Sequence, residues 1–335
     1  MGKKLTLFVL LGLVILSLTF ALSQSNTQTG EHPFILSWGS YGSGFGQFRS
    51  PMGVTISPDG LINVSQYDSP CRVQRFTSQG TYISQFGSCG SPPPVDGTFI
   101  LLVDVATDDA GNFYTIEALG ARVQKFSPTG TFLMKWGGYG AEDGKFDHPS
   151  GIAIGNESVY VVDRLNNRIQ RFDMNGSFIG KWGSPGTGSG QFTFPNRVAV
   201  DEIGNVYVSD KNHIQKFTSD GSFISAFGSY GSGDGQFMNP NGVAFDVFEN
   251  IYVVDTENHR VQKFSKNFVF LTKWGSLGMA PAPGVFFGPT GIAIESPGYI
   301  YIADTNNHRI QKFGPGTTGV KIDNTTWGQL KSLFR

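Results

Sequence analysis

One short motif recurs six times and constrains the fold more than any other feature of the sequence. It reads Val or Ile, then Gln, then Lys or Arg, then Phe, and its Phe residues lie 50, 46, 45, 47 and 49 positions apart. Self-similarity at such a period indicates a repeat architecture, in which each unit hides its apolar faces against its neighbours. The six copies are Val73–Phe76, Val123–Phe126, Ile169–Phe172, Ile214–Phe217, Val261–Phe264 and Ile310–Phe313.

Four short strands are predicted in each unit. In the third unit they are Gly151–Ile154, Val159–Val162, Arg168–Phe172 and Ser177–Trp182, which we call strands a, b, c and d. The chain has 45 Gly residues in 335, about twice the usual share of roughly 7%, as tight turns require. Strands a and b are almost wholly apolar, so both faces of each sheet must be covered. We therefore predict an all-β fold, a six-bladed β-propeller of four-stranded antiparallel blades.

A second motif, an aromatic residue followed by Gly, also occurs six times, but its copies are offset from the units defined by the strand c motif. Its first copy precedes the first unit, and the sixth unit ends at Phe313 without a strand d of its own. We therefore expect Phe34–Trp38 to complete the last blade, which joins the two ends and leaves no open edge in the ring. The aromatic residues of this motif are Trp38, Phe86, Trp136, Trp182, Phe227 and Trp274.

The N-terminus has the pattern of a secretory signal. Lys3 and Lys4 precede an apolar run that ends in Ala21-Leu22-Ser23, so residues 1–23 are predicted to be a signal peptide; an uncleaved membrane anchor is the alternative. The propeller is expected over residues 31–316, followed by a tail at 317–335 that can form a short helix. We expect a secreted or periplasmic monomer with no membrane span in the mature chain.

The connections between strands b and c carry a family resemblance. They read DTENHR at Asp255–Arg260, DTNNHR at Asp304–Arg309 and DRLNNR at Asp163–Arg168, each followed by the strand c motif. Over residues 34–313 the chain resembles the NHL-repeat family. The resemblance implies a propeller, but little about function, since such propellers are interaction platforms, RNA binders and, in a few lineages, enzymes.

An acid and an arginine recur at the two ends of these connections, five residues apart. A repeated carboxylate–guanidinium pair most simply pins the hairpin, whereas a catalytic dyad repeated around the ring is implausible. The fourth unit departs from the pattern: its connection is two residues shorter, and His213 takes the Arg position opposite Asp210. Irregular blades are where we expect a grafted site. The predicted structural pairs are Glu117 and Arg122, Asp163 and Arg168, Asp255 and Arg260, and Asp304 and Arg309.

No catalytic residue, metal or cofactor is assigned. The lyases among NHL-like proteins carry metal-binding His residues on inner strands, but the corresponding openings here carry Met52, Ser150, Asn196, Asn241 and Thr290. The carboxylates of a lactonase-like site are not evident at these openings either. A binding role is therefore favoured over catalysis. The alternative function is a metal-assisted lyase or a lactonase-like hydrolase at the channel mouth.

The leading hypothesis is an interaction module for a protein, peptide or glycan. The face where the d–a and b–c loops gather is the expected surface, and Asn196, Arg197 and Asn241 are the candidate ligand-binding residues. The formal charge of −1 argues against nucleic acid as a partner.

Cys71 and Cys89 are the only two cysteines. They stand at the start of strand c and just past strand d of one hairpin, within bridging range by antiparallel counting. In an oxidising compartment a disulfide is favoured over metal binding or two free thiols.

Overall fold

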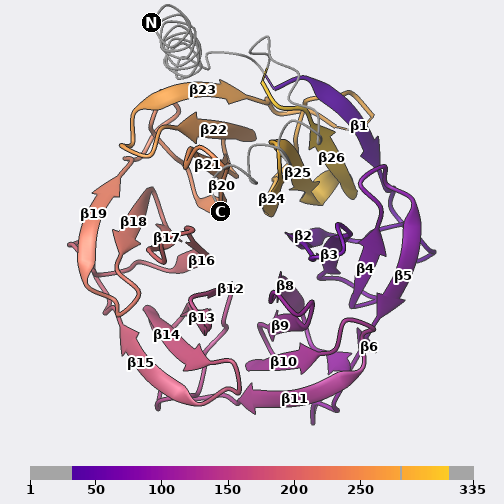
Figure 1. The fold of residues 1–335 in the computed structure, drawn as a ribbon, viewed down its shortest axis with the longest axis vertical. Coiled ribbons are helices and arrows are strands. Elements are labelled where there is room, and N and C mark those ends of the chain that lie inside the picture. The colour runs from indigo at the N-terminus through magenta and orange to yellow at the C-terminus, as the bar shows by residue number, and fades with distance from the viewer. Residues whose placement is uncertain (1–31, 280, 317–335) are drawn as a thin grey trace, which may run out of the picture. The chain divides into compact units, whose positions relative to one another are not determined.

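The computed structural model describes residues 32–279 and 281–316, of which Phe34–Pro315 form one compact unit. This unit is a six-bladed β-propeller, as the repeats predict. Six four-stranded sheets surround a central axis, with strand a of each blade innermost and strand d at the rim (Figure 1). The predicted signal peptide and the predicted tail helix lie outside the described residues. Within those residues no helix is long and apolar enough to cross a membrane.

Each blade is antiparallel, with its strands in the order a, b, c, d. Blade 1 contains β2 (Pro51–Ile56), β3 (Ile62–Gln66), β4 (Arg72–Phe76) and β5 (Tyr82–Phe86). Blade 2 contains β8 (Leu102–Thr107), β9 (Phe113–Glu117), β10 (Arg122–Phe126) and β11 (Phe132–Gly137). Blade 3 contains β12 (Gly151–Gly155), β13 (Ser158–Asp163), β14 (Arg168–Asp173) and β15 (Phe178–Trp182).

The second half of the ring repeats this arrangement. Blade 4 contains β16 (Pro195–Val200), β17 (Val206–Asp210), β18 (His213–Phe217) and β19 (Phe223–Phe227). Blade 5 contains β20 (Pro240–Phe245), β21 (Ile251–Asp255), β22 (Arg260–Phe264) and β23 (Phe270–Trp274). Blade 6 contains β24 (Ile292–Glu295), β25 (Tyr299–Asp304), the 3-10 turn η1 (Thr305–Asn307) and β26 (Arg309–Phe313). A short parallel pair, β6 (Ser88–Cys89) and β7 (Thr98–Phe99), lies between blades 1 and 2.

The sixth blade is closed by the strand that begins the described chain. β1 (Phe34–Trp38) pairs antiparallel with β26, with Trp38 opposite Ile310 and Ser37 opposite Gln311. The first and last strands of the propeller therefore lie side by side in Figure 1. This confirms the ring closure predicted from the offset between the strand c motif and the aromatic-Gly motif. The inner edge of β1 is paired with β26, the last strand of the propeller.

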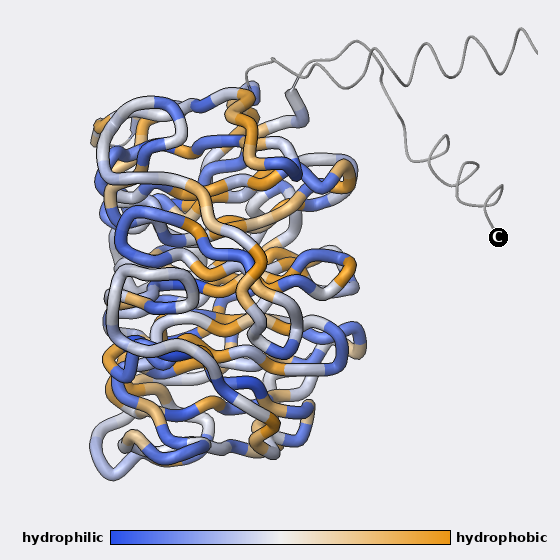
Figure 2. Tube along the Cα trace, turned by 90° about the vertical axis from the view of Figure 1, so that its left-hand side faces the viewer, coloured by the Kyte–Doolittle hydropathy of each residue, from blue (hydrophilic) through white to orange (hydrophobic). Residues whose placement is uncertain are grey.

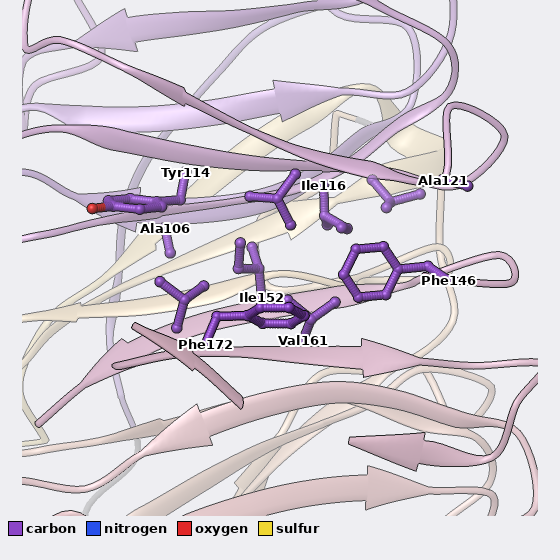
Figure 3. Packing of buried hydrophobic residues seen from close by; sticks show 11 residues of the cluster. Ala106, Tyr114, Ile116, Ala121, Phe146, Ile152, Val161 and Phe172 are labelled. Atoms are coloured by element: carbon purple, nitrogen blue, oxygen red, sulfur yellow. The ribbon is translucent and has the colours of Figure 1, made fainter. Parts of the chain in front are cut away.

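The core is divided into six apolar clusters, one between each pair of adjacent blades. Between blades 2 and 3, Tyr114 and Ile116 face Ile152, Val161 and Phe172, all buried (Figure 3). Apolar residues follow the strands, and hydrophilic residues gather in many of the connecting turns (Figure 2). No blade has a core of its own, so each is stabilised by its neighbours, as expected for a repeat protein.

The Gln of the strand c motif fastens the connection that enters its blade. In every blade its side-chain oxygen accepts a Gly N–H at 2.9–3.0 Å, and its amide donates to a backbone carbonyl of the same d–a loop at 2.6–2.8 Å. A buried amide thereby satisfies loop groups that would otherwise lack partners. The six residues are Gln74, Gln124, Gln170, Gln215, Gln262 and Gln311.

Candidate binding site

In four blades the acid at the end of strand b lies against the arginine that begins strand c. In blade 3 the Nε of Arg168 is 2.6 Å from a carboxylate oxygen of Asp163, and the guanidinium also donates to the carbonyls of Glu142 and Lys145. Both side chains are buried. Each pair thus ties a b–c hairpin to the d–a loop beside it. The equivalent distances are 2.7 Å for Arg122–Glu117, 2.7 Å for Arg260–Asp255 and 2.8 Å for Arg309–Asp304.

Blade 4 lacks this pair. Asp210 is fully buried, and one of its oxygens accepts the N–H of Thr193 at 2.8 Å. The other oxygen has no hydrogen-bond partner among the described residues, and the nearest ring nitrogen of His213 is 3.9 Å away. Burial raises the pKa of Asp210 to about 6 and lowers the pKa of His213. The two-residue deletion therefore leaves a buried carboxylate without its usual cation.

A cavity of about 470 Å³ runs along the axis of the ring, lined by strand a of all six blades. These strands end their sheets, so the backbone groups on their inner edges face the axis. At one level of the cavity the guanidinium of Arg197 lies 3.3 Å from the carboxylate of Asp104. The residues one position earlier in the strands, such as Ser150, do not line the cavity. The pair therefore marks one end of the cavity, and the a–b turns line the other.

The Asp104–Arg197 pair connects three blades. A carboxylate oxygen of Asp104 accepts the N–H of Ile152 at 3.2 Å, and Arg197 donates to the carbonyls of Val103, at 3.0 Å, and Ser150. Burial raises the pKa of Asp104, and the charge of Arg197 opposes that shift. Four other blades carry glycine at this strand position, namely Gly53, Gly151, Gly242 and Gly291.

Sequence analysis missed Asp104. Strand a of blade 2 lacks the Pro-x-Gly segment that marks this position in four other blades, so no carboxylate was expected near the axis. Aligning the units on their strand c motifs would have placed Asp104 opposite Gly242 and Gly291, because each of the three lies 22 residues before the Phe of its motif. A β-carbon added at Gly53 would overlap the Asp104 carboxylate, so the glycine in blade 1 makes room for it.

The three predicted ligand-binding residues do not lie at one common site in the structure. Arg197 lines the axial cavity, whereas Asn196 and Asn241 do not. Asn196 is buried, and its amide donates to the carbonyl of Pro240 at 2.9 Å and to Asn239 at 2.8 Å. Asn241 donates to the hydroxyl of Thr256 at 3.2 Å. Both asparagines therefore have partners within the protein.

A second cavity, of about 400 Å³, opens over the irregular blade. The b–c connection of blade 4 is only Lys211–Asn212, whereas blades 3 and 5 use four residues there, 164–167 and 256–259. The shorter turn leaves a depression between its longer neighbours. We call it the blade 4 hollow; its lining includes Arg164, Phe194, Lys211, Tyr230, Met238 and Glu257.

Two histidines of the repeat motif hold adjacent blades together. Nδ1 of His308 accepts the N–H of Ser50 at 3.2 Å, and Nδ1 of His259 accepts that of Gly288 at 3.1 Å. In blade 3, Asn167 takes the same role toward Phe194 at 2.9 Å. Among the described residues no group of three or more His, Cys, Asp or Glu is arranged to hold a metal ion.

Cys71 and Cys89 form a disulfide, with their Cα atoms 4.6 Å apart. The bond links the residue before β4 to the short strand β6, which follows β5 in the chain. It therefore fastens the irregular connection between blades 1 and 2.

Comparison with known proteins agrees with this architecture. A family model described as a 6-bladed beta-propeller matches residues 141–215, and the NHL repeat model matches residues 237–264 and 286–313. The chain is thus a six-bladed β-propeller, and its last two blades match the NHL repeat. No curated protein matches it.

Solved structures share the fold at low sequence identity. A protein of unknown function from Bacteroides thetaiotaomicron is 18% identical, with a TM-score of 0.63 over 83% of this chain and 76% of its own. An auxiliary nutrient binding protein from Bacteroides ovatus is 14% identical, with a TM-score of 0.60 over 86% and 78%. A streptogramin B lyase is 14% identical, with a TM-score of 0.59 over 86% and 99%. Such likeness shows the fold alone.

Proposed function

We propose that the chain is an exported binding module that receives a peptide or glycan on the face formed by the b–c and d–a connections. The observation that carries this proposal is the blade 4 hollow, since concave sites with a few polar groups among apolar ones are typical of ligand binding. The basic and apolar N-terminal pattern supports export. Nutrient-binding proteins with the same fold support a binding role for this scaffold.

Exposed aromatic residues support the choice of face. In the d–a connections Tyr41, Tyr139 and Tyr230 are 63%, 75% and 66% exposed, and Phe194 is 52% exposed. Large apolar side chains left in solvent on one face commonly mark interaction sites. Phe194 and Tyr230 line the hollow itself, so they are its natural contacts for a ligand.

Arrays of glycans and peptides, followed by titration calorimetry of the best binder, test the proposal. Phe194→Ala and Tyr230→Ala should each weaken binding about tenfold or more, equivalent to about 1.4 kcal/mol. Phe248→Ala is the matched control, because Phe248 is also half exposed but lies in the a–b turn of blade 5. The proposal fails if neither array yields a binder, or if both hollow variants bind as tightly as the control.

A further inference from the structure

The blade 4 hollow has an unbalanced set of charges. Arg164 and Lys211 line it, and neither side chain forms an ion pair or hydrogen bond with another described residue. Glu257 is the single acid among the lining residues, against two cations. A half-buried guanidinium normally gains a carboxylate or a carbonyl partner, because an unpaired charge is poorly solvated there.

The surroundings of Arg164 increase this imbalance. Burial lowers its pKa, and the positive charge of Arg197 lowers it further. Arg197 is itself a cation, and the carboxylate nearest to it, Asp104, is its own ion-pair partner. Lys211 stands at the tip of the shortened turn with its ammonium exposed to solvent. Burial raises the pKa of Asp210 and the charge of Lys211 opposes that shift, but neither Lys211 nor Arg164 has a carboxylate within ion-pair distance among the described residues. An anionic group placed in the hollow would therefore meet two cations that lack a direct carboxylate partner.

The other residues that line the hollow favour a ligand in which the anionic group is attached to a sugar ring. Phe194 and Tyr230 present exposed aromatic rings, which suit the apolar faces of sugar rings. Asn212 and Glu257 supply an amide and a carboxylate that can bind hydroxyl groups.

The main chain around the hollow is already paired. The N–H of Asn239 donates to the carbonyl of Lys211 at 3.0 Å, and that of Phe194 donates to Asn167 at 2.9 Å. A peptide that bound by adding a strand would need such groups free. A compact ligand therefore suits the hollow better than an extended chain.

We propose that the blade 4 hollow binds an acidic sugar, with Arg164 and Lys211 holding its carboxylate and Phe194 and Tyr230 contacting its ring. This inference rests on the proposed binding function and names the ligand class of the same site. Blades 3, 4 and 5 are consecutive in the ring, so the site is complete within one chain (Figure 1).

Calorimetry with three probes of similar size tests the inference: trigalacturonate, its methyl ester and triglutamate. Trigalacturonate should bind, and more weakly as salt is raised, because its charge is screened. The methyl ester keeps the rings but removes the charge, and it should bind at least tenfold more weakly. Triglutamate keeps the charges without the rings and should bind at least tenfold more weakly than trigalacturonate.

Arg164→Gln and Lys211→Gln should each reduce trigalacturonate affinity at least tenfold and flatten its salt dependence. Lys266→Gln, on an exposed lysine of blade 5 that pairs with Glu249, should change neither. Unchanged melting temperatures would show that all three variants are folded.

Each contrary outcome has a distinct meaning. Equal binding of the acid and its ester, unaffected by either hollow variant, overturns the anion site but leaves glycan binding intact. Preference for triglutamate overturns the sugar assignment in favour of an acidic peptide. Failure of all three probes overturns the inference, whereas the broader proposal fails only with the arrays.

Discussion

At the scale of single residues, Asp210 shows what a shortened turn does to a repeated ion pair. In the other blades with an acid here, an arginine five residues later neutralises it, but the deletion brings His213 to that place. The imidazole nitrogen is 3.9 Å away, too far for a hydrogen bond. With a pKa of about 6 instead of 3.8, ionised Asp210 destabilises the fold by about 3 kcal/mol at pH 8.

Asp210→Asn should therefore stabilise the protein at alkaline pH. Because the pKa of Asp210 is higher in the folded state, that state binds more protons between about pH 4 and 6, and stability falls as pH rises through this window. The variant should raise the free energy of unfolding by about 1–3 kcal/mol at pH 8 and change it little at pH 4. Denaturant unfolding at both pH values measures this.

Asp163→Asn is the matched control for Asp210→Asn. It removes the closer carboxylate from buried Arg168, leaving only that of Asp143 at 3.9 Å, and should destabilise the protein by about 3–5 kcal/mol at pH 8. Equal destabilisation by both variants would show that Asp210 has an effective counter-charge.

At the scale of an element, the last blade depends on contacts between the two ends of the chain. Trp38 of β1 packs against Tyr301 of its own blade, at 6.1 Å between ring centroids, and Phe76 of blade 1, at 5.8 Å. His308 then accepts the N–H of Ser50 in the connection that enters blade 1. Closure is therefore secured both by strand pairing and by a hydrogen bond that requires a neutral imidazole.

His308→Asn should make ring stability less dependent on pH. Burial lowers the pKa of His308 despite the nearby Asp68 and Asp304, so its stabilising contribution is present above about pH 6.5 and is lost as pH falls below that value. Asn167 shows that an amide oxygen can accept the equivalent N–H without titrating. The melting temperature of the Asn variant should fall less than that of the wild type between pH 7.5 and pH 5.

His308→Ala provides the comparison for His308→Asn. It removes the acceptor altogether and should lose about 1 kcal/mol at pH 7.5. Parallel pH profiles of the wild type and the Asn variant would contradict a role for His308 titration in closure.

The disulfide is a second device at this scale, and it acts on the connection between blades 1 and 2. Replacing Cys71 and Cys89 together with Ser should lower the free energy of unfolding by about 3 kcal/mol, as for a loop of this length. Unfolding with and without reductant measures the effect, and the double variant should not respond to reductant. If reductant left the stability of the wild type unchanged as well, the disulfide would not stabilise the fold.

At the scale of the whole molecule, the Asp104–Arg197 pair links blades that are not adjacent. It spans blades 2 and 4 and binds the backbone of blade 3 between them, close to the axis. Buried ion pairs of this kind add little net stability. Removing one partner is nevertheless destabilising, because the other remains buried as an uncompensated charge. We interpret the pair as a brace at one end of the axial cavity.

A double-mutant cycle tests this brace. Asp104→Gly or Arg197→Gly alone should destabilise the protein by about 3–5 kcal/mol, because each leaves a buried charge. Together they restore the glycine of four other blades, and the double variant should be clearly more stable than the sum of the singles predicts. Denaturant unfolding of the four proteins gives the coupling energy. Additive effects would show that the two charges act independently.

The fold could be predicted in detail because its determinants are local and repeated. Six copies of one motif set the number of blades, and a surplus aromatic-Gly motif at Trp38 placed the closing strand. Strand bounds in blade 3 differ by one residue from those expected, because the last pair at each hairpin depends on the turn. The residues near the axis were harder to predict from the sequence: Arg197 was predicted to bind a ligand, but its partner Asp104 was not identified.

The sequence alone thus determined the six-bladed ring, its closure and the irregularity of blade 4, since each is written in residues that lie close together in the chain. Only the tertiary structure decided that Asp104 meets Arg197 and that Arg164, Lys211 and Tyr230 share one hollow. Those residues belong to different blades. Their meeting depends on how the sheets are placed around the axis and on the relative lengths of neighbouring turns, which no single repeat encodes.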